Sequence, residues 1–141
     1  MNKKELLISA LASGASEEFS PVQLQKLIFL IDSELSPQVG GAYFHFKPYH
    51  YGPFDVTVYE EFLKLELEGL CHTKGNGKTR AYMITEPGKK YAKKILNSLS
   101  ESQKKYISEV ARFVQSLAFP QLVSSIYKAY PHMKVNSVFR G

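Results

Sequence analysis

The chain has 141 residues, a hydrophobic content of 44% and a formal net charge of +5. This length predicts one domain whose core needs no disulfide or metal for stability, and the composition excludes a disordered chain. No apolar run reaches the roughly 18 residues of a membrane span, and a single cysteine excludes an intramolecular disulfide framework and is typical of the reducing cytoplasm.

Two helices are predicted at the start of the chain. The first extends from about Lys3 to Ser13. Its lysines and short apolar run resemble the start of a signal peptide, but its leucines share one helical face, which favours a helix of the domain. The second begins with Ser20 as N-cap, Pro21 in the first turn and Gln23 completing a capping box. Its apolar stripe is the longest in the chain, so we expect this helix to be central. We expect its solvent side to consist of Gln25, Lys26 and Asp32.

An aromatic stretch follows the second helix. Residues 43–49 alternate in character and predict a strand, and residues 51–54, Tyr-Gly-Pro-Phe, predict a rigid turn. Asp55 is a candidate N-cap for a third helix, and Phe54 is expected to contact Tyr59 of that helix. We expect its inner face to consist of Val56, Tyr59, Phe62, Leu63, Leu67 and Leu70.

A basic hairpin follows the third helix. Residues 75–77, Gly-Asn-Gly, supply the positive φ angles of a tight turn, and the flanking residues alternate as in half-buried strands. Helix, basic hairpin and helix in this order form the winged-helix plan, with the hairpin as the wing. Three more helical patterns follow, beginning near residues 85, 100 and 120. The sequence therefore predicts a mainly α fold with a small β component. Within this single domain, residues 1–99 form a winged-helix-like core, 100–131 a C-terminal helical pair and 132–141 a tail.

Charge is distributed unevenly along the chain. Between Cys71 and Lys105 lie nine lysine or arginine and two glutamate residues, a net charge of +7, whereas the remainder carries −2. Such a sector suits an anionic partner, although lysines on the solvent side of helices give the same pattern. The third helix, which enters the major groove in winged-helix proteins, carries a net −4 between Asp55 and Glu68. This sign disfavours groove insertion and leaves weak, non-specific DNA binding through the wing and the fourth helix. The candidate nucleic-acid contacts are Lys74, Lys78, Arg80, Lys89, Lys90 and Lys93.

The aromatic stretch offers a different kind of site. The ordinary interpretation of such a cluster is core plus turn, but Tyr49, Tyr51 and Phe54 cannot all turn inward around one proline turn. Because exposed aromatic residues are typical anchors of protein interfaces, these three residues are the candidate protein-interaction residues.

No catalytic, cofactor or metal site is predicted. Cys71 and His72 are adjacent, so they point to opposite faces of a strand, and the other histidines lack the paired spacing of zinc ligands. The chain has no nucleophile elbow, phosphate-binding loop or dinucleotide fingerprint. An enzyme is therefore the least favoured interpretation.

Several short motifs occur in a fixed order: Leu24-Gln25-Lys26-Leu27-Ile28-Phe29-Leu30, an aromatic strand, Tyr51-Gly52-Pro53, Val58-Tyr59 and Gly69-Leu70. In this order they resemble the Panacea domain, whose members include SocA-like antitoxins and phage-associated proteins. The resemblance extends from about Ser20 to Leu96 and is carried by the Leu-Gln-Lys-Leu and Tyr-Gly-Pro motifs together. It implies a non-enzymatic bacterial or phage protein that neutralises a toxin by direct contact. The chain departs from the family in Phe54, where an aliphatic residue is common, and in its additional C-terminal helices.

The leading hypothesis is a non-enzymatic protein-interaction module, antitoxin-like or a subunit of a bacterial or phage defence system. Its expected partner is a toxin or a defence-system subunit. The alternative is a winged-helix transcriptional regulator that binds DNA with its basic wing. The sequence predicts no cofactor and no membrane partner, and it leaves self-association open.

Overall fold

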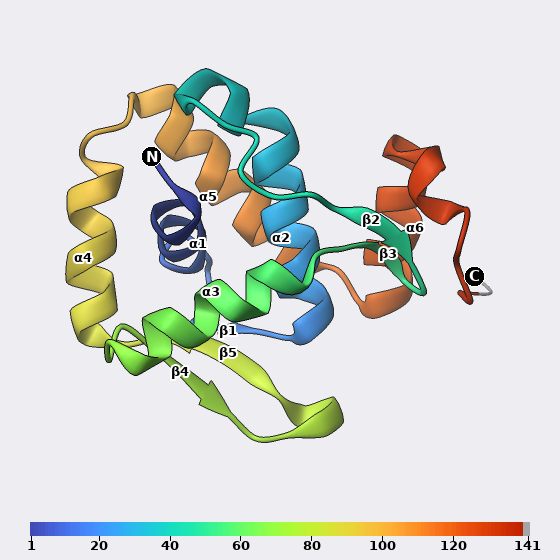
Figure 1. The fold of residues 1–141 in the computed structure, drawn as a ribbon, viewed down its shortest axis with the longest axis horizontal. Helices are drawn as coiled ribbons and strands as arrows, with labels where there is room; N and C mark the ends of the chain where they lie inside the picture. Colours follow the sequence, from blue (N-terminus) through green and yellow to red (C-terminus); the bar gives the residue numbers. More distant parts are fainter. Residues whose placement is uncertain (140–141) are drawn as a thin grey trace.

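The structure, a computed structural model, describes residues 1–139. Its α-helices are α1 (Lys3–Leu11), α2 (Pro21–Glu34), α3 (Val56–Leu67), α4 (Glu86–Leu96), α5 (Glu101–Ser116) and α6 (Phe119–Ala129). Its strands are β1 (Glu18–Phe19), β2 (Lys47–Tyr49), β3 (Gly52–Phe54), β4 (Cys71–Lys74) and β5 (Ala81–Ile84). Short 3-10 helices occupy η1 (Ser36–Val39), η2 (Gly77–Thr79) and η3 (Pro131–Lys134). The predicted mainly α fold with a small β component is confirmed (Figure 1).

The first half of the chain has winged-helix topology. Strands β1, β5 and β4 form an antiparallel sheet in that order, and β4 and β5 form the wing. Strand β1 was not predicted; it has two residues, of which Glu18 pairs with Met83 and Phe19 with Tyr82. The elements α1, β1, α2, α3, β4 and β5 therefore follow one another as in a winged helix. The predicted winged-helix-like core is confirmed, with hairpin β2–β3 inserted between α2 and α3.

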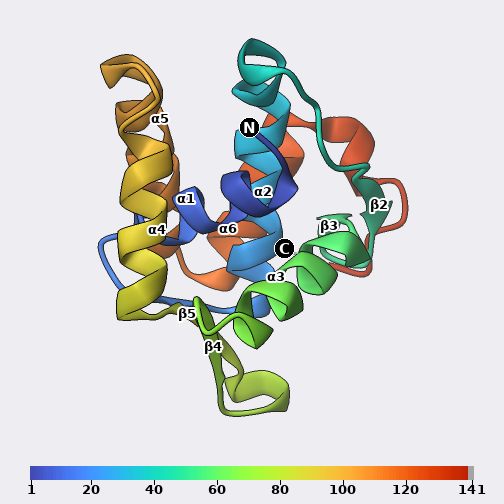
Figure 2. The ribbon, with the colours of Figure 1, turned by 60° about the vertical axis from the view of Figure 1, so that its left-hand side comes forward.

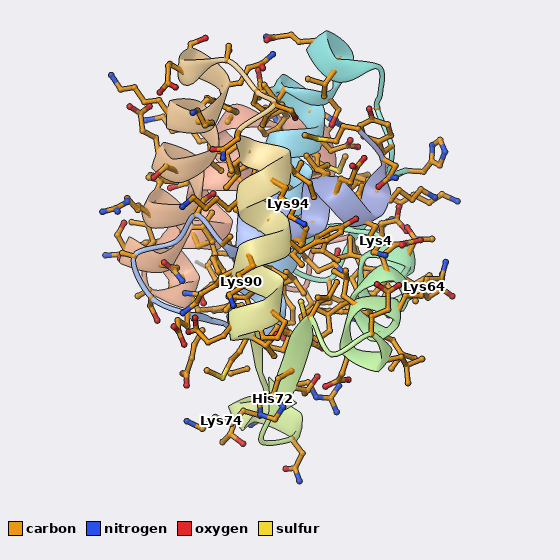
Figure 3. The ribbon with its side chains drawn as sticks, turned by 90° about the vertical axis from the view of Figure 1, so that its left-hand side faces the viewer. Lys4, Lys64, His72, Lys74, Lys90 and Lys94 are labelled. Carbon is orange, nitrogen blue, oxygen red and sulfur yellow. The ribbon has the colours of Figure 1, made fainter. Side chains whose placement is uncertain are left out.

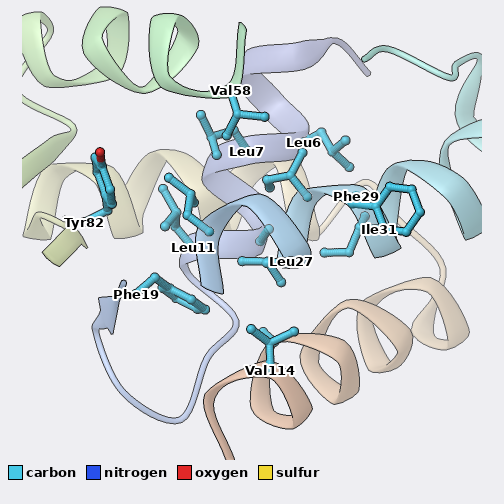
Figure 4. Close-up of a cluster of buried hydrophobic side chains, with 14 of the residues drawn as sticks. Leu6, Leu7, Leu11, Phe19, Leu27, Phe29, Ile31, Val58, Tyr82 and Val114 are labelled. Carbon is cyan, nitrogen blue, oxygen red and sulfur yellow. The ribbon is translucent and has the colours of Figure 1, made fainter. Parts of the chain in front are cut away.

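Helix α2 is central, as predicted. It packs against α1, α5, α6 and β3, and its residues Leu27 and Ile31 have no exposed surface. Leu6 and Leu7 of α1 and Val114 of α5 surround it in the hydrophobic core (Figure 4). Helices α5 and α6 contribute buried residues to this same core, so they pack on the winged-helix elements rather than around a core of their own.

The predicted solvent side of α2 was wrong. Gln25, Lys26 and Asp32 are 2%, 3% and 3% exposed. They are buried because the chain from residue 41 to residue 55 covers this side of the helix. The Asp32 carboxylate accepts hydrogen bonds from the backbone N–H groups of Tyr43, at 2.8 Å, and Phe44, at 3.0 Å.

The predicted strand over residues 43–49 is also shorter than expected. Residues 41–46 have no regular secondary structure, and only Lys47–Tyr49 forms a strand, β2, which pairs with β3. Two backbone N–H groups of the irregular part donate to the Asp32 carboxylate, which explains how this segment is buried without a sheet partner.

The inner face predicted for α3 was partly wrong. Val58, Phe62 and Leu65 are its buried residues, whereas Val56, Leu63 and Leu67 are 54%, 54% and 80% exposed. The two sets form separate stripes, each with helical spacing, so the sequence pattern alone did not choose between them. Packing on α1 and β4 selects the first stripe and leaves the second at the surface.

The wing differs from the predicted tight turn. Gly75 and Gly77 have positive φ angles of 71° and 54°, as expected, but Lys74 pairs with Ala81, so the loop spans residues 75–80 and contains η2. Within residues 1–139, no helix is long and apolar enough to cross a membrane. The last two residues of the predicted tail, 140 and 141, lie outside the described part of the chain.

Candidate protein-interaction surface

Hairpin β2–β3 is supported by the C-terminal segment. Its two strands pair with Pro48 opposite Pro53, and His50 and Tyr51 form the turn. The backbone N–H of Val138 donates to the His50 carbonyl at 2.9 Å, and the Asn136 side chain donates to the Pro48 carbonyl at 3.3 Å. The hairpin therefore lies between α6 with its following segment and α3, at the opposite end of the molecule from α4 (Figure 1).

Helix α2 holds the other side of the hairpin through buried polar side chains. The Gln25 amide donates to the Asp55 carbonyl and accepts from the Asp55 N–H, both at 3.0 Å. Lys26 Nζ donates to the Pro53 carbonyl at 3.2 Å. The motifs Leu-Gln-Lys-Leu and Tyr-Gly-Pro, far apart in the sequence, therefore contact each other directly.

Gly52 lies beside Lys26 and Tyr127 at this contact. Its φ of 105° favours glycine, and a Cβ placed there would lie 3.4 Å from both Lys26 Cε and Tyr127 Cε1. Both distances are ordinary van der Waals contacts, so the positive φ rather than a lack of space favours glycine here. Glycine thus allows the backbone conformation in which β3 packs against the buried lysine.

Asp55 joins the end of the hairpin to α3. Its carboxylate caps the helix by accepting from the Thr57 N–H at 2.9 Å, and it accepts from the His45 N–H at 2.7 Å. Burial alone would raise the pKa of Asp55, but the hydrogen bonds from Thr57 and His45 outweigh this effect and lower it. The predicted N-cap is confirmed, and it fixes the direction in which α3 leaves the hairpin.

The three candidate interaction residues lie on one surface. Tyr49 and Tyr51 are 49% and 43% exposed, whereas Phe54 is half-buried. The Phe54 ring lies 5.1 Å from that of Tyr49 and 5.9 Å from that of Tyr59, which confirms the predicted Phe54–Tyr59 contact. Tyr51 packs edge-on against Phe119 at 5.2 Å. The rings thus support one another and remain partly open to solvent.

Two hollows flank the Tyr49 and Phe54 rings. The smaller, of about 160 Å³, is lined by Pro21, Val22, Gln25, Lys26, Tyr49, Tyr51, Gly52, Phe54 and Tyr59. The larger, of about 470 Å³, is lined by His45, Lys47, Pro48, Tyr49, Phe54, Asp55, Val56 and Thr57. We refer to the smaller one as the Lys26 hollow. Because Val56 lines the larger one, the hairpin surface continues onto α3.

The α3 outer face, defined here by Val56, Glu60, Leu63 and Leu67, is apolar and acidic. These residues recur at helical spacing and are all exposed. Helix α3 lies at the surface with hairpin β2–β3 at one end and the wing at the other (Figure 2). In a DNA-binding winged helix this helix faces the phosphates. Three apolar residues and a glutamate do not suit that role, but they suit contact with a protein.

The predicted nucleic-acid contacts fall into two groups. Lys74 pairs with Glu18 at 3.1 Å, and Lys89 pairs with Glu17 and Glu86. Among the described residues, Lys78, Arg80, Lys90 and Lys93 form no ion pair, and all four are exposed. Lys90 and Lys94 point outward from α4 on the side of the molecule where Lys74 of the wing lies (Figure 3). This basic side is separate from the hairpin surface.

No group of three or more histidine, cysteine, aspartate or glutamate residues within residues 1–139 is arranged to hold a metal ion. Cys71 is buried, and burial raises the pKa of its thiol to about 12. His72, its neighbour, is exposed.

Sequence reasoning missed two parts of this surface: the buried polar side of α2 and the α3 outer face. A signal for the first was present, because Phe29 and Leu30 place apolar residues around much of α2, as in a helix buried on several sides. No such signal distinguished the two stripes of α3. In comparisons with known proteins, no protein-family model and no curated protein matches the chain.

Proposed function

We propose that the chain is a non-enzymatic protein-interaction module that binds its partner through hairpin β2–β3 and the α3 outer face. The observation that carries this proposal is the set of exposed apolar residues that follows the hairpin and one face of α3, namely Tyr49, Tyr51, Val56, Leu63 and Leu67. Contiguous exposed apolar surface on a stable domain is typical of a protein interface. Aromatic residues on a rigid support are the usual anchors of such interfaces.

The biological role that fits is that of an antitoxin or a subunit of a bacterial or phage defence system. The resemblance in the Leu-Gln-Lys-Leu and Tyr-Gly-Pro motifs supports it, since their contact builds the support under the hairpin. The partner is then a toxin or a defence-system subunit. We place this role in the cytoplasm, because the one cysteine is a buried free thiol, which suits a reducing compartment.

The test uses the proteins encoded beside this gene. Each is purified and titrated into the chain by isothermal titration calorimetry. We expect Tyr49→Ala, Tyr51→Ala and Leu63→Ala each to weaken the complex by at least about tenfold, as truncated anchor residues do. Phe113→Ala is the matched control, because Phe113 is 45% exposed but lies on α5. If the partner is toxic, the same three variants should fail to restore growth when co-expressed with it.

Two results contradict the proposal. One is a complex whose affinity is unchanged by all three substitutions. The other is a chain that forms no complex with any protein encoded beside it.

A second candidate function is weak DNA binding through the wing and α4. It is favoured by Lys78, Arg80, Lys90 and Lys93, which are exposed and form no ion pair among the described residues. In fluorescence anisotropy with a random duplex, binding should be lost between about 20 mM and about 150 mM salt, since phosphate contacts weaken steeply with ionic strength. Lys78→Glu combined with Arg80→Glu should abolish it, whereas Lys128→Glu on α6 should not. Nanomolar binding to one specific duplex at physiological salt would instead favour the regulator over the protein-interaction module.

A further inference from the structure

Lys26, one of the residues that line the Lys26 hollow, carries a positive charge with no counter-ion among residues 1–139. Lys26 is 3% exposed, and among the described residues its Nζ donates to one acceptor, the Pro53 carbonyl. An ammonium group has three N–H donors. Within residues 1–139, no carboxylate lies within ion-pair distance of it. Buried charges in proteins are ordinarily paired, so this lysine is an exception that calls for a physical reason.

The other polar groups of the hollow are already satisfied. The Gln25 amide is used on both sides by the Asp55 backbone, and the Tyr59 hydroxyl donates to the Pro21 carbonyl at 3.3 Å. Burial raises the pKa of Tyr59 to about 12, so this hydroxyl is neutral at physiological pH. The lining includes no aspartate or glutamate. The hollow therefore combines aromatic sides with one cationic donor that has spare hydrogen-bonding capacity.

We propose that the Lys26 hollow receives the carboxylate of a glutamate or aspartate side chain from the partner protein. The carboxylate accepts from Lys26 Nζ, while the apolar stem of the inserted residue packs between the Tyr49, Tyr51 and Phe54 rings. This inference rests on the protein-interaction function proposed above and specifies its partner, which must present an acidic side chain flanked by apolar residues. Tyr49 and Tyr51, both exposed, form the part of the lining that contacts the flanking residues.

Size and charge favour a carboxylate over a phosphate. A volume of about 160 Å³ suits one short side chain. Phosphate recognition ordinarily uses several donors, with arginine over-represented, whereas the hollow has one lysine. The α3 outer face then contacts an apolar patch of the partner, and the Lys26 hollow binds an acidic residue beside that patch.

The test measures discrimination between an acidic probe and its neutral isostere. N-acetyl-glutamate N-methylamide and the matching glutamine compound are titrated into the chain, and the NMR signals of the lysine Cε groups and of the tyrosine rings are followed. We expect saturable shifts of the Lys26 and Tyr49 signals with the glutamate compound, and binding at least about tenfold weaker for the glutamine compound, because a charge-assisted bond is replaced by a neutral one. Lys26→Met should abolish the discrimination. Lys47→Met, which removes an exposed lysine of the same hairpin, should preserve it.

In this titration, the proposal is overturned by equal affinity for the two compounds, by discrimination that persists in Lys26→Met, or by no saturable shift at about 50 mM, well above the millimolar Kd open to a ligand of this size. Tighter binding of inorganic phosphate than of the glutamate compound overturns it in favour of a general anion site. The outcome is separable from that of the proposed function. If the partner's affinity falls with Tyr49→Ala but not with Lys26→Met, the carboxylate inference alone is wrong. If affinity is unchanged in Lys26→Met and also in Tyr49→Ala, Tyr51→Ala and Leu63→Ala, the interaction surface is wrong as well.

Discussion

Replacing Lys26 by methionine should stabilise the isolated chain near neutral pH. Burial lowers the pKa of Lys26 from 10.5 to about 8. At about 1.4 kcal/mol for each tenfold change in proton affinity, this difference corresponds to roughly 3 kcal/mol against folding when the amine is charged. Methionine has a similar length without the charge, but it leaves the Pro53 carbonyl without its donor, which offsets about 1–2 kcal/mol. The net expectation is a gain of about 1–2 kcal/mol at about pH 7.

The stability difference between the wild type and Lys26→Met should depend on pH. Between about pH 8 and 10.5 the unfolded chain keeps a proton on Lys26 that the folded chain has lost, so the unfolded state binds more protons and stability rises with pH. The penalty is therefore present below pH 8 and disappears as the pH approaches 10.5. Other groups also titrate in this range, but their contributions are common to both proteins and cancel in the difference. The advantage of Lys26→Met should thus shrink, and then reverse, as the pH rises.

Urea denaturation of both proteins at a series of pH values measures this difference. The m-values should agree, so that the difference in midpoint reports stability alone. A Lys26→Met variant that is less stable than the wild type at about pH 7 by more than about 1 kcal/mol would refute the reasoning. So would a difference that stays constant between pH 7 and 10.5, because Lys26 would then have an ordinary proton affinity in the folded chain.

Three further substitutions test the support under the hairpin and the core, each by denaturant titration. Leu27→Ala should cost roughly 2–5 kcal/mol, because Leu27 has no exposed surface, and a loss under about 0.5 kcal/mol would mean that the stripe of α2 faces solvent. Asp32→Ala should cost about 2–4 kcal/mol by leaving two N–H donors of the irregular segment unpaired, and Asp32→Asn should cost less, since one amide oxygen can still accept; equal losses would contradict this assignment. Gly52→Ala should cost about 1–3 kcal/mol through its φ of 105°, whereas Gly69→Ala, whose φ of 79° lies nearer the left-handed region that other residues can adopt, should cost less.

Local rules in the sequence predicted the helix starts well. Ser20 with Gln23 forms the predicted capping box, and Asp55 is the predicted N-cap of α3. The helices expected near residues 85 and 100 begin in the same way, with Thr85 as the cap of α4 and Ser100 with Gln103 as the capping box of α5. These interactions link residues two or three positions apart, so no tertiary information is needed to find them. The winged-helix plan could likewise be predicted from element order, because the wing glycines and the flanking helices are adjacent in the chain.

Burial of polar residues on α2 could not be predicted in the same way. In the sequence, Gln25, Lys26 and Asp32 form the polar face of an amphipathic helix, which is ordinarily exposed to solvent. In the structure they are buried because residues 41–55 cover this face. Their hydrogen-bond partners are backbone groups of that segment. Every residue has such groups, so the order of side chains in the sequence does not show which of them will be partners. The same limit applies to α3, where either of two stripes satisfies the helical period and only packing on α1 and β4 selects one. Both errors concern the residues that build the candidate site.

The buried polar side of α2 explains how a short hairpin can present aromatic residues. Isolated two-stranded hairpins are marginally stable at best, and exposed aromatic rings tend to collapse onto the nearest apolar surface. Here Gln25 and Lys26 hold β3 and Asp55 from one side, and the segment after α6 holds the hairpin turn from the other. Directional hydrogen bonds fix the position of the strands without covering the outward faces of Tyr49 and Tyr51, which an apolar support would have drawn inward. The charge on Lys26 destabilises this support when no partner is bound, so a carboxylate that neutralises it would bind more tightly than its contacts with the aromatic rings alone allow. The free energy of folding that the unpaired charge costs in the isolated chain would thereby contribute to the affinity and specificity for an acidic partner.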